Sequence, residues 1–284
     1  MIPIRDRRKI MSEAVEEIRQ GKRFAFGKNW KNFLQSINED HIREAEKDLK
    51  NMLEMESLTD KSFLDVGSGS GLSSLAARRL GAKVFSFDYD PLSIACTREM
   101  KKRFFPDDPD WTIQEGSALD SEYIKSLGQF DIVYSWGVLH HTGNMWQALK
   151  NVQLPVKNNR GILFIAIYND QGIISGLWKT VKKLYCSSIA GKIFFTALFF
   201  PYFFLTGLAA DAIRLKNPLK RYTDYKKKRG MSITTDWLDW LGGYPFEVAR
   251  PVDIIRFFEK NKFELLRLKT TRRMGNNQFV FKKS

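Results

Sequence analysis

The sequence has 284 residues, of which 43% are hydrophobic, enough to build one large domain or two small ones. Its two cysteines, Cys96 and Cys186, exclude a disulfide framework, and no cysteine–histidine cluster has the spacing of a metal site. Residues 1–21 lack the apolar core of a signal peptide, so we expect a cytoplasmic protein without a bound metal.

The net charge of +14 is concentrated in one segment. From Gly176 to Gly230 there are 12 Lys and Arg against 2 Asp and Glu, whereas Asp60 to Asp170 holds 12 against 13. Most of the chain is therefore electrostatically ordinary, and the excess charge marks the segment from 176 to 230 for a separate role.

Taken in chain order, the predicted elements begin with a helix over about residues 30–58, within a helical cap at 1–59. Short apolar runs then alternate with helical patterns, which is typical of βαβ units and of a parallel sheet covered on both faces. The predicted strands are Phe63–Val66, Val84–Phe87, Thr112–Gln114, Asp131–Ser135 and Gly161–Tyr168, and the helices between them are Leu72–Leu80, Pro91–Phe104 and Asn144–Asn151.

The pattern breaks after Tyr168 and resumes with a helix at Pro251–Asn261 and two strands at Phe263–Thr270 and Asn276–Lys283. The link between these strands is too short for a crossover helix, so we expect them to be antiparallel. The predicted fold class is therefore α/β, with a core at 60–170, a helical insert at 171–248 after the fifth strand, and a final helix and two strands at 249–284.

A glycine-rich turn joins the first strand to the first helix of this core. Ligands of open parallel sheets lie beyond the carboxyl ends of the strands, and glycine is needed where the backbone takes positive φ or a ligand lies against it. Asp88 ends the second strand, where a carboxylate can accept hydrogen bonds from both hydroxyls of a ribose. The turn therefore predicts a nucleoside ligand. Its residues are Gly67, Ser68, Gly69, Ser70 and Gly71.

The spacing of this turn excludes two common nucleotide sites. It has the form G-x-G-x-G and not the G-x-G-x-x-G of dinucleotide-binding proteins, and no Lys-Ser/Thr pair follows, which excludes a phosphate-binding P-loop. Asp65 precedes the turn and would repel a pyrophosphate, but it suits a ligand with an ammonium and a sulfonium. A strand–turn–helix that merely happens to be glycine-rich is the alternative.

Together with Asp65 and Asp88, the turn resembles motif I of the class I S-adenosylmethionine-dependent methyltransferases. Glu115–Asp120, Phe130–Thr142 and Gly161–Asp170 resemble the later motifs of this family, so the resemblance covers about 60–170 and the final helix and strands. It implies S-adenosylmethionine as the cofactor. It also implies a Rossmann-like, mostly parallel seven-stranded sheet of order 3-2-1-4-5-7-6 with an antiparallel seventh strand.

The resemblance also implies which residues contact the cofactor. Ser117 stands where the family usually has an acid that contacts the adenine amine, which leaves that role to Ser117 or to the backbone of Ala118. An N-terminal aromatic segment folds over the cofactor in related enzymes, so Lys28 or Trp30 would reach its methionine part, unless this segment is an ordinary docking helix. The predicted cofactor contacts are Asp65, Gly67, Ser68, Gly69, Gly71, Asp88, Tyr89, Ser117, Ala118, Trp136, Lys28 and Trp30.

The loop after the fourth strand bears on the methyl acceptor. Ser135–Val138 lacks the N-P-P-Y of enzymes that methylate amide or base nitrogens, and Val138–His141 resembles the loop of the ubiquinone and menaquinone methyltransferases. Transfer to a hydroxyl requires alignment and removal of a proton, for which His140 or His141 is the predicted base and Tyr168 a further candidate. Helix capping, packing against the cofactor and core packing are the alternatives for these three residues.

The insert contains an uncharged run at Ile193–Ala210, long enough for a transmembrane helix. A single crossing would separate strands that share one sheet, and Pro201 is expected to divide the run into two halves. We therefore expect a helical hairpin that dips into an anionic membrane or closes over a hydrophobic substrate. The predicted basic flanks are Lys179, Lys182, Lys183, Lys216, Lys220, Arg221 and Lys226–Arg229.

These observations favour a cytoplasmic methyltransferase, peripheral at the inner face of the membrane if the insert binds lipid, that methylates a hydrophobic or lipid-linked small molecule at oxygen. An RNA methyltransferase that uses the basic insert is one alternative, but no recognised RNA-binding module accompanies the charge, so we expect no nucleic-acid partner. A non-catalytic membrane adaptor that binds the cofactor is the other, and the intact glycine turn with Asp88 disfavours it.

Overall fold

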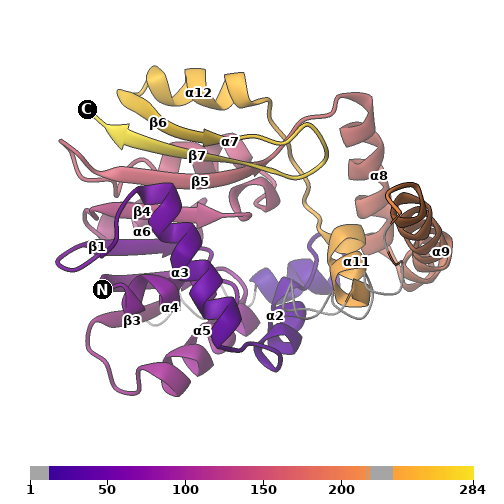
Figure 1. Cartoon of the computed structure of the whole chain (residues 1–284), viewed down its shortest axis with the longest axis horizontal. Coiled ribbons are helices and arrows are strands. Elements are labelled where there is room, and N and C mark those ends of the chain that lie inside the picture. Colours follow the sequence, from indigo (N-terminus) through magenta and orange to yellow (C-terminus); the bar gives the residue numbers. More distant parts are fainter. Residues whose placement is uncertain (1–12, 216, 218–232) are drawn as a thin grey trace.

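The computed structural model describes residues 13–215, 217 and 233–284, and a seven-stranded sheet forms its centre (Figure 1). The strand order is β3-β2-β1-β4-β5-β7-β6, and β7 runs antiparallel to both of its neighbours. This order confirms the predicted fold class. The strands are β1 (Ser62–Val66), β2 (Lys83–Asp88), β3 (Trp111–Glu115), β4 (Ile132–Trp136), β5 (Ile162–Tyr168), β6 (Phe263–Lys269) and β7 (Asn276–Lys283).

Helices cover both faces of the sheet, because successive residues of the central strands point to opposite sides. Phe63 and Ile132 pack in one buried cluster with residues of α3 and α4, whereas Leu64 and Val133 pack in the other with residues of α7 and α12. A strand buried on both faces is apolar at consecutive positions, which is the pattern in the sequence. The core helices are α4 (Leu72–Arg79), α5 (Pro91–Phe104), α6 (Ser121–Ser126), α7 (Met145–Asn151) and α12 (Pro251–Glu259).

The N-terminal segment differs from the single helix predicted over 30–58. After a first helix at 13–19, it forms α2 (Phe26–Leu34) and α3 (Glu39–Leu53), separated by a short break. Asn38 causes the break, because its side chain accepts a hydrogen bond from the His41 backbone N–H at 3.1 Å and so begins a new helix. The prediction was wrong at these boundaries. α2 packs against α5 and thereby lies beside the carboxyl ends of β1 and β2.

The insert between β5 and α12 contains α8 (Ile173–Ser187), α9 (Ile189–Ile213) and α11 (Ile233–Gly242), which lie beside the sheet where β5 leads into α8 (Figure 1). The expectation that Pro201 divides the apolar run was wrong, since α9 is continuous. Phe199 and Phe203, on either side of Pro201 in the sequence, both pack on Trp178 of α8, and this packing holds the helix together across the proline.

Within the described residues, α9 is the one helix that is long and apolar enough to cross a membrane, a finding that rests on length and composition alone. The predicted basic residues Lys216, Lys220, Arg221 and Lys226–Arg229 lie outside the described residues.

Candidate functional site

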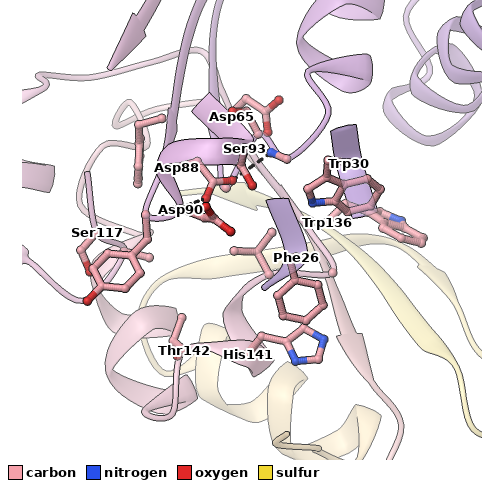
Figure 2. Close-up of a pocket in the computed structure, with 18 of the residues that line it drawn as sticks. Phe26, Trp30, Asp65, Asp88, Asp90, Ser93, Ser117, Trp136, His141 and Thr142 are labelled. Carbon is pink, nitrogen blue, oxygen red and sulfur yellow. Dashed lines mark hydrogen bonds between the residues drawn. The ribbon is translucent and has the colours of Figure 1, made fainter. Parts of the chain in front are cut away.

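A cavity of about 690 Å³ lies beyond the carboxyl ends of the parallel strands (Figure 2). Its wall combines the glycine turn after β1, the end of β2, the loops after β3 and β4, and the end of β5. Aromatic residues of α2 and the segment before it, Asp239 of α11 and Asn276 of β7 add to the wall, together with the charged residues Glu13, Glu17 and Arg23. This volume is typical of sites for small molecules and cofactors.

The glycine turn forms part of this wall where the chain has no room for side chains. Gly67 has φ +80°, and a Cβ atom there would come within 2.4 Å of a Val138 methyl group. Gly69 has φ +55°, and its Cβ would lie 3.0 Å from the indole nitrogen of Trp30. Gly71 also has positive φ, but it is the N-cap of α4 and is absent from the cavity wall, so its contact with the cofactor stays a prediction.

Asp65 is a buried carboxylate at the base of the cavity, at the end of a chain of hydrogen bonds. Trp111 Nε1, which can only donate, lies 2.9 Å from Ser86 Oγ, and Ser86 Oγ lies 2.7 Å from Ser74 Oγ. Ser74 donates to Asp65 at 2.5 Å, so each hydroxyl in the chain donates toward the carboxylate. Burial raises the pKa of Asp65 to about 7, and the charge of Asp88 adds to this effect. A cation in the cavity would favour the ionised carboxylate.

Asp88 ties the end of β2 to the glycine turn. One carboxylate oxygen accepts from the Gly69 N–H at 2.9 Å and the other from the Asp90 N–H at 2.9 Å. Burial raises the pKa of Asp88 to about 6, although these backbone donors oppose the rise. A carboxylate has about four acceptor positions, so Asp88 retains capacity for ligand hydroxyls. The predicted pairing of this residue with a ribose is compatible with its position in the wall.

Five further residues that were predicted to contact the cofactor line the cavity. Ser117 and Ala118 line the cavity, but Ser117 Oγ already accepts from the Leu119 N–H at 3.2 Å. The Ala118 carbonyl accepts from the Asn151 amide at 2.9 Å. These two residues therefore have fewer free acceptor positions for an adenine. Ser68, Tyr89 and Trp136 also line the cavity.

The N-terminal segment covers part of the cavity, with Trp30 against Gly69 and Phe26 beside His141 (Figure 2). It is anchored by a buried hydrogen bond in which the Gly27 N–H donates to Asp90 at 2.9 Å. Lys28 is exposed and is not part of the wall, because it lies on the outer side of α2. The prediction that Trp30 lies at the cavity is compatible with the structure, whereas the structure places Lys28 outside the wall and leaves its contact with the cofactor a prediction.

The two predicted histidines lie in a 3₁₀ helix at Leu139–His141, and only His141 lines the cavity. His140 is fully buried, and its Nδ1 accepts from the Tyr168 backbone N–H at 3.4 Å, so it packs beneath the site. His141 Nδ1 lies 2.6 Å from the Pro245 carbonyl oxygen. Since a carbonyl can only accept, Nδ1 carries the proton and Nε2 has a free electron pair. Burial lowers the pKa of His141 to about 3, so the ring is neutral at pH 7.

Tyr168 lines the cavity beside the histidines, with its ring 5.4 Å from that of His141. Phe26 lies beside His141, at 4.8 Å between ring centroids (Figure 2). The structure therefore brings His141 and Tyr168 together in an aromatic part of the cavity and places His140 outside it.

Sequence reasoning missed Asp239 of α11, which lines the cavity and accepts from the Asn29 amide at 3.0 Å. Burial raises its pKa to about 6. Lys182 of α8 lies nearby, with its Nζ bonded to the Trp240 carbonyl and 4.2 Å from the centre of the Trp240 ring. Burial lowers the pKa of Lys182 to about 7, and the charge of Asp239 opposes this effect.

Lys182 was predicted as part of an exposed basic flank, and that prediction was wrong, because the side chain is fully buried. The helical spacing of Trp178, Lys182 and Tyr185 places the lysine on the same face as two packed aromatics, which is the signal that could have revealed it. Across the described residues, no group of three or more His, Cys, Asp or Glu side chains is arranged to hold a metal ion.

Comparison with known proteins identifies a methyltransferase domain in the part of the chain that forms the glycine turn and the following strands. A family model described as a methyltransferase domain matches residues 64–165. The ribosomal protein L11 methyltransferase of Prochlorococcus marinus (strain MIT 9515) is 35% identical over 126 residues, which are 42% of this chain and 39% of that protein. Polyketide synthase PksR of Bacillus subtilis is 28% identical over 143 residues, 46% of this chain and 6% of that protein. The chain spans less than half the length of these curated relatives.

Solved structures share the fold. PKMT2 from Rickettsia typhi in complex with AdoHcy has a TM-score of 0.53 at 14% identity, over 87% of this chain and 53% of that one. An O-methyltransferase family protein from Burkholderia thailandensis has a TM-score of 0.52 at 11% identity, over 86% of this chain and 57% of that one. At these identities the likeness shows the fold alone.

Proposed function

We propose that this chain, whose core is a class I S-adenosylmethionine-dependent methyltransferase domain, transfers a methyl group to a hydroxyl oxygen of a hydrophobic or lipid-linked small molecule. The observation that carries the proposal is the make-up of the single cavity described above. The glycine turn and the carboxylates of Asp65 and Asp88 form one part of the cavity. His141 and Tyr168 lie among aromatic side chains in another part.

The residues of the first part fit the cofactor. Asp88 retains acceptor capacity for the ribose hydroxyls, and a bound ammonium group would favour the ionised form of Asp65. The absence of side chains at Gly67 and Gly69 leaves room for Val138 and Trp30 to lie against the turn. When bound, S-adenosylmethionine supplies an electrophilic methyl group on a positively charged sulfur. Trp30 covers the turn and helps to exclude water from this part of the cavity.

The second part fits an apolar acceptor with a hydroxyl group. The aromatic rings of Phe24, Phe26 and Tyr168 line it and offer apolar contact area. His141 Nε2 would accept the hydrogen bond of the acceptor hydroxyl and so align its oxygen. Because its pKa is low, His141 is a weak base, and we assign it alignment of the hydroxyl before full removal of the proton.

The acceptor class is tested by incubating the protein with S-adenosylmethionine labelled in the methyl group and an extract of cells that lack the gene. The products are then separated into lipid-soluble, small polar, protein and RNA fractions. Label is expected in the lipid-soluble fraction, and Asp88→Ala should abolish most of it. Label only in RNA would contradict the proposal and favour an RNA methyltransferase that uses the basic insert. Label only in protein would contradict it and favour a protein acceptor.

A further inference from the structure

One long face of α9 is apolar and is not covered by the rest of the described protein. The helix has no charged residue from Ile193 to Ala210, and five large apolar side chains on this stretch are 52–66% exposed. A helix that faces water normally carries polar residues on its outer side. The exposed side chains are Ile193, Phe194, Leu198, Tyr202 and Leu205.

The opposite face of α9 is fixed to the domain by aromatic packing. Phe199 lies 5.1 Å from Trp178 of α8, and Phe200 lies 5.2 Å from Trp237 of α11, measured between ring centroids. The helix is therefore held along one side and open along the other, and in Figure 1 it forms the outer side of the insert, away from the sheet.

The neighbouring helix α8 also carries exposed apolar side chains, together with exposed lysines. Ile173, Leu177 and Leu184 are exposed one to two turns apart on the same side of α8. Lys179 and Lys183 are exposed as well, but at 3.6 residues per turn they lie about a quarter turn or more round the helix from these apolar side chains. We call this set, with the open face of α9, the outer face of the insert.

From this combination we infer that the outer face of the insert docks on the surface of an anionic lipid bilayer. Exposed apolar side chains that enter the acyl boundary, with lysines on a flank of the same pair of helices that reach anionic head groups, have the composition of an interfacial membrane site. An uncovered apolar face of this length is unfavourable in water, and exposed lysines on the same pair of helices favour an anionic lipid surface over an uncharged partner.

Docking on the surface, and not crossing, follows from the fold. β5 precedes α9 and β7 follows it, yet these strands pair along seven residues. A single crossing would place them on opposite sides of the bilayer, and the described residues contain no second candidate span. The packed face of α9 would also have to leave α8 and α11 before lipid could surround the helix.

The test is co-sedimentation of the purified chain with vesicles of phosphatidylcholine alone or mixed with phosphatidylglycerol. Wild type should bind the mixed vesicles more tightly. Phe194→Ser with Leu205→Ser should weaken binding at least about tenfold, because two side chains lose apolar burial. The control Leu266→Ser removes a similarly exposed leucine from β6 and should bind as wild type does. Wild type that ignores mixed vesicles, or equal binding by the double variant and its control, would overturn the inference.

The charge contribution is tested separately. Lys179→Glu with Lys183→Glu should weaken binding to mixed vesicles at least about tenfold, since each basic residue near an anionic surface contributes about fivefold. The control pair Lys102→Glu and Lys150→Glu makes the same change in net charge elsewhere on the surface. Equal loss in both pairs would mean that net charge alone governs binding and would overturn the assignment to this face.

A second copy of the chain is the competing occupant of the apolar face. Light scattering that shows a dimer, broken by Phe194→Ser with Leu205→Ser, together with no vesicle binding, would overturn the inference in favour of self-association. Thermal unfolding checks that each variant is folded. Vesicle binding is measured without cofactor or acceptor, so its outcome is independent of the proposed methyl transfer.

Discussion

Replacing Lys182 by methionine removes a buried amine while keeping an unbranched side chain of similar length. Burial lowers the pKa of this lysine from 10.5 to about 7. Since a tenfold change in proton affinity is worth about 1.4 kcal/mol, the protonated lysine destabilises the fold by about 4–5 kcal/mol relative to the neutral amine.

The sign of the resulting pH dependence follows from the two pKa values. Because the folded pKa is lower than the unfolded one, the unfolded chain binds more protons between pH 7 and pH 10.5. The free energy of unfolding of wild type therefore gains about 3–4 kcal/mol from this residue between pH 7 and pH 10. Lys182→Met lacks the gain, whereas contributions from groups that do not interact with Lys182 are common to both proteins.

The assay is urea unfolding of wild type and Lys182→Met at several pH values from 7 to 10, followed by circular dichroism. The difference in unfolding free energy between the two should change by about 3–4 kcal/mol over this range. Lys183→Met, which alters the exposed neighbour, serves as the control and should run parallel to wild type. Parallel curves for wild type and Lys182→Met would refute the burial of the amine.

Two further predictions concern the cavity. Gly69→Ala should weaken binding of S-adenosylhomocysteine at least about tenfold in calorimetry, because its Cβ meets Trp30, whereas Gly128→Ala carries the same positive-φ strain in open space and should bind normally. If Gly69→Ala binds S-adenosylhomocysteine as tightly as Gly128→Ala does, the assignment of the glycine turn to cofactor binding is contradicted. His141→Ala should lower kcat about 100-fold at every pH from 5 to 8 without weakening cofactor binding, since a pKa of about 3 leaves the ring neutral throughout. A wild-type rate that falls with a midpoint near pH 6.5 and becomes pH-independent in His141→Ala would contradict this role.

The sheet could be predicted from the sequence because its signals are local. Each strand is a short apolar run such as Ile162–Tyr168, and glycine spacing identifies the turn after β1 without knowledge of any distant residue. The strand order came from the family resemblance, and the structure confirms it. The chemistry of Asp65 could be anticipated only in part, since the donor chain through Ser74 and Ser86 depends on tertiary packing.

The insert was predicted less well for a physical reason. Whether Pro201 breaks a helix depends on what packs against the turns around it, and Phe199 and Phe203 find that support on α8. Whether Lys182 is exposed depends on which face of α8 is covered by α11. The choice between His140 and His141 likewise depends on which of two adjacent side chains turns toward the cavity.

Binding of S-adenosylhomocysteine by wild type and Asp88→Ala, measured by calorimetry, tests the central claim most directly. Wild type should bind, and Asp88→Ala should bind about 10- to 100-fold more weakly, because hydrogen bonds to a charged acceptor contribute about 1.5–3 kcal/mol each. Since Asp88 also holds the Gly69 N–H, thermal unfolding must show that the variant is folded. Asp253→Ala, which removes a carboxylate remote from the cavity wall, should bind as wild type does. No binding by wild type, or equal affinity in folded Asp88→Ala, would contradict the assignment of this cavity to the cofactor.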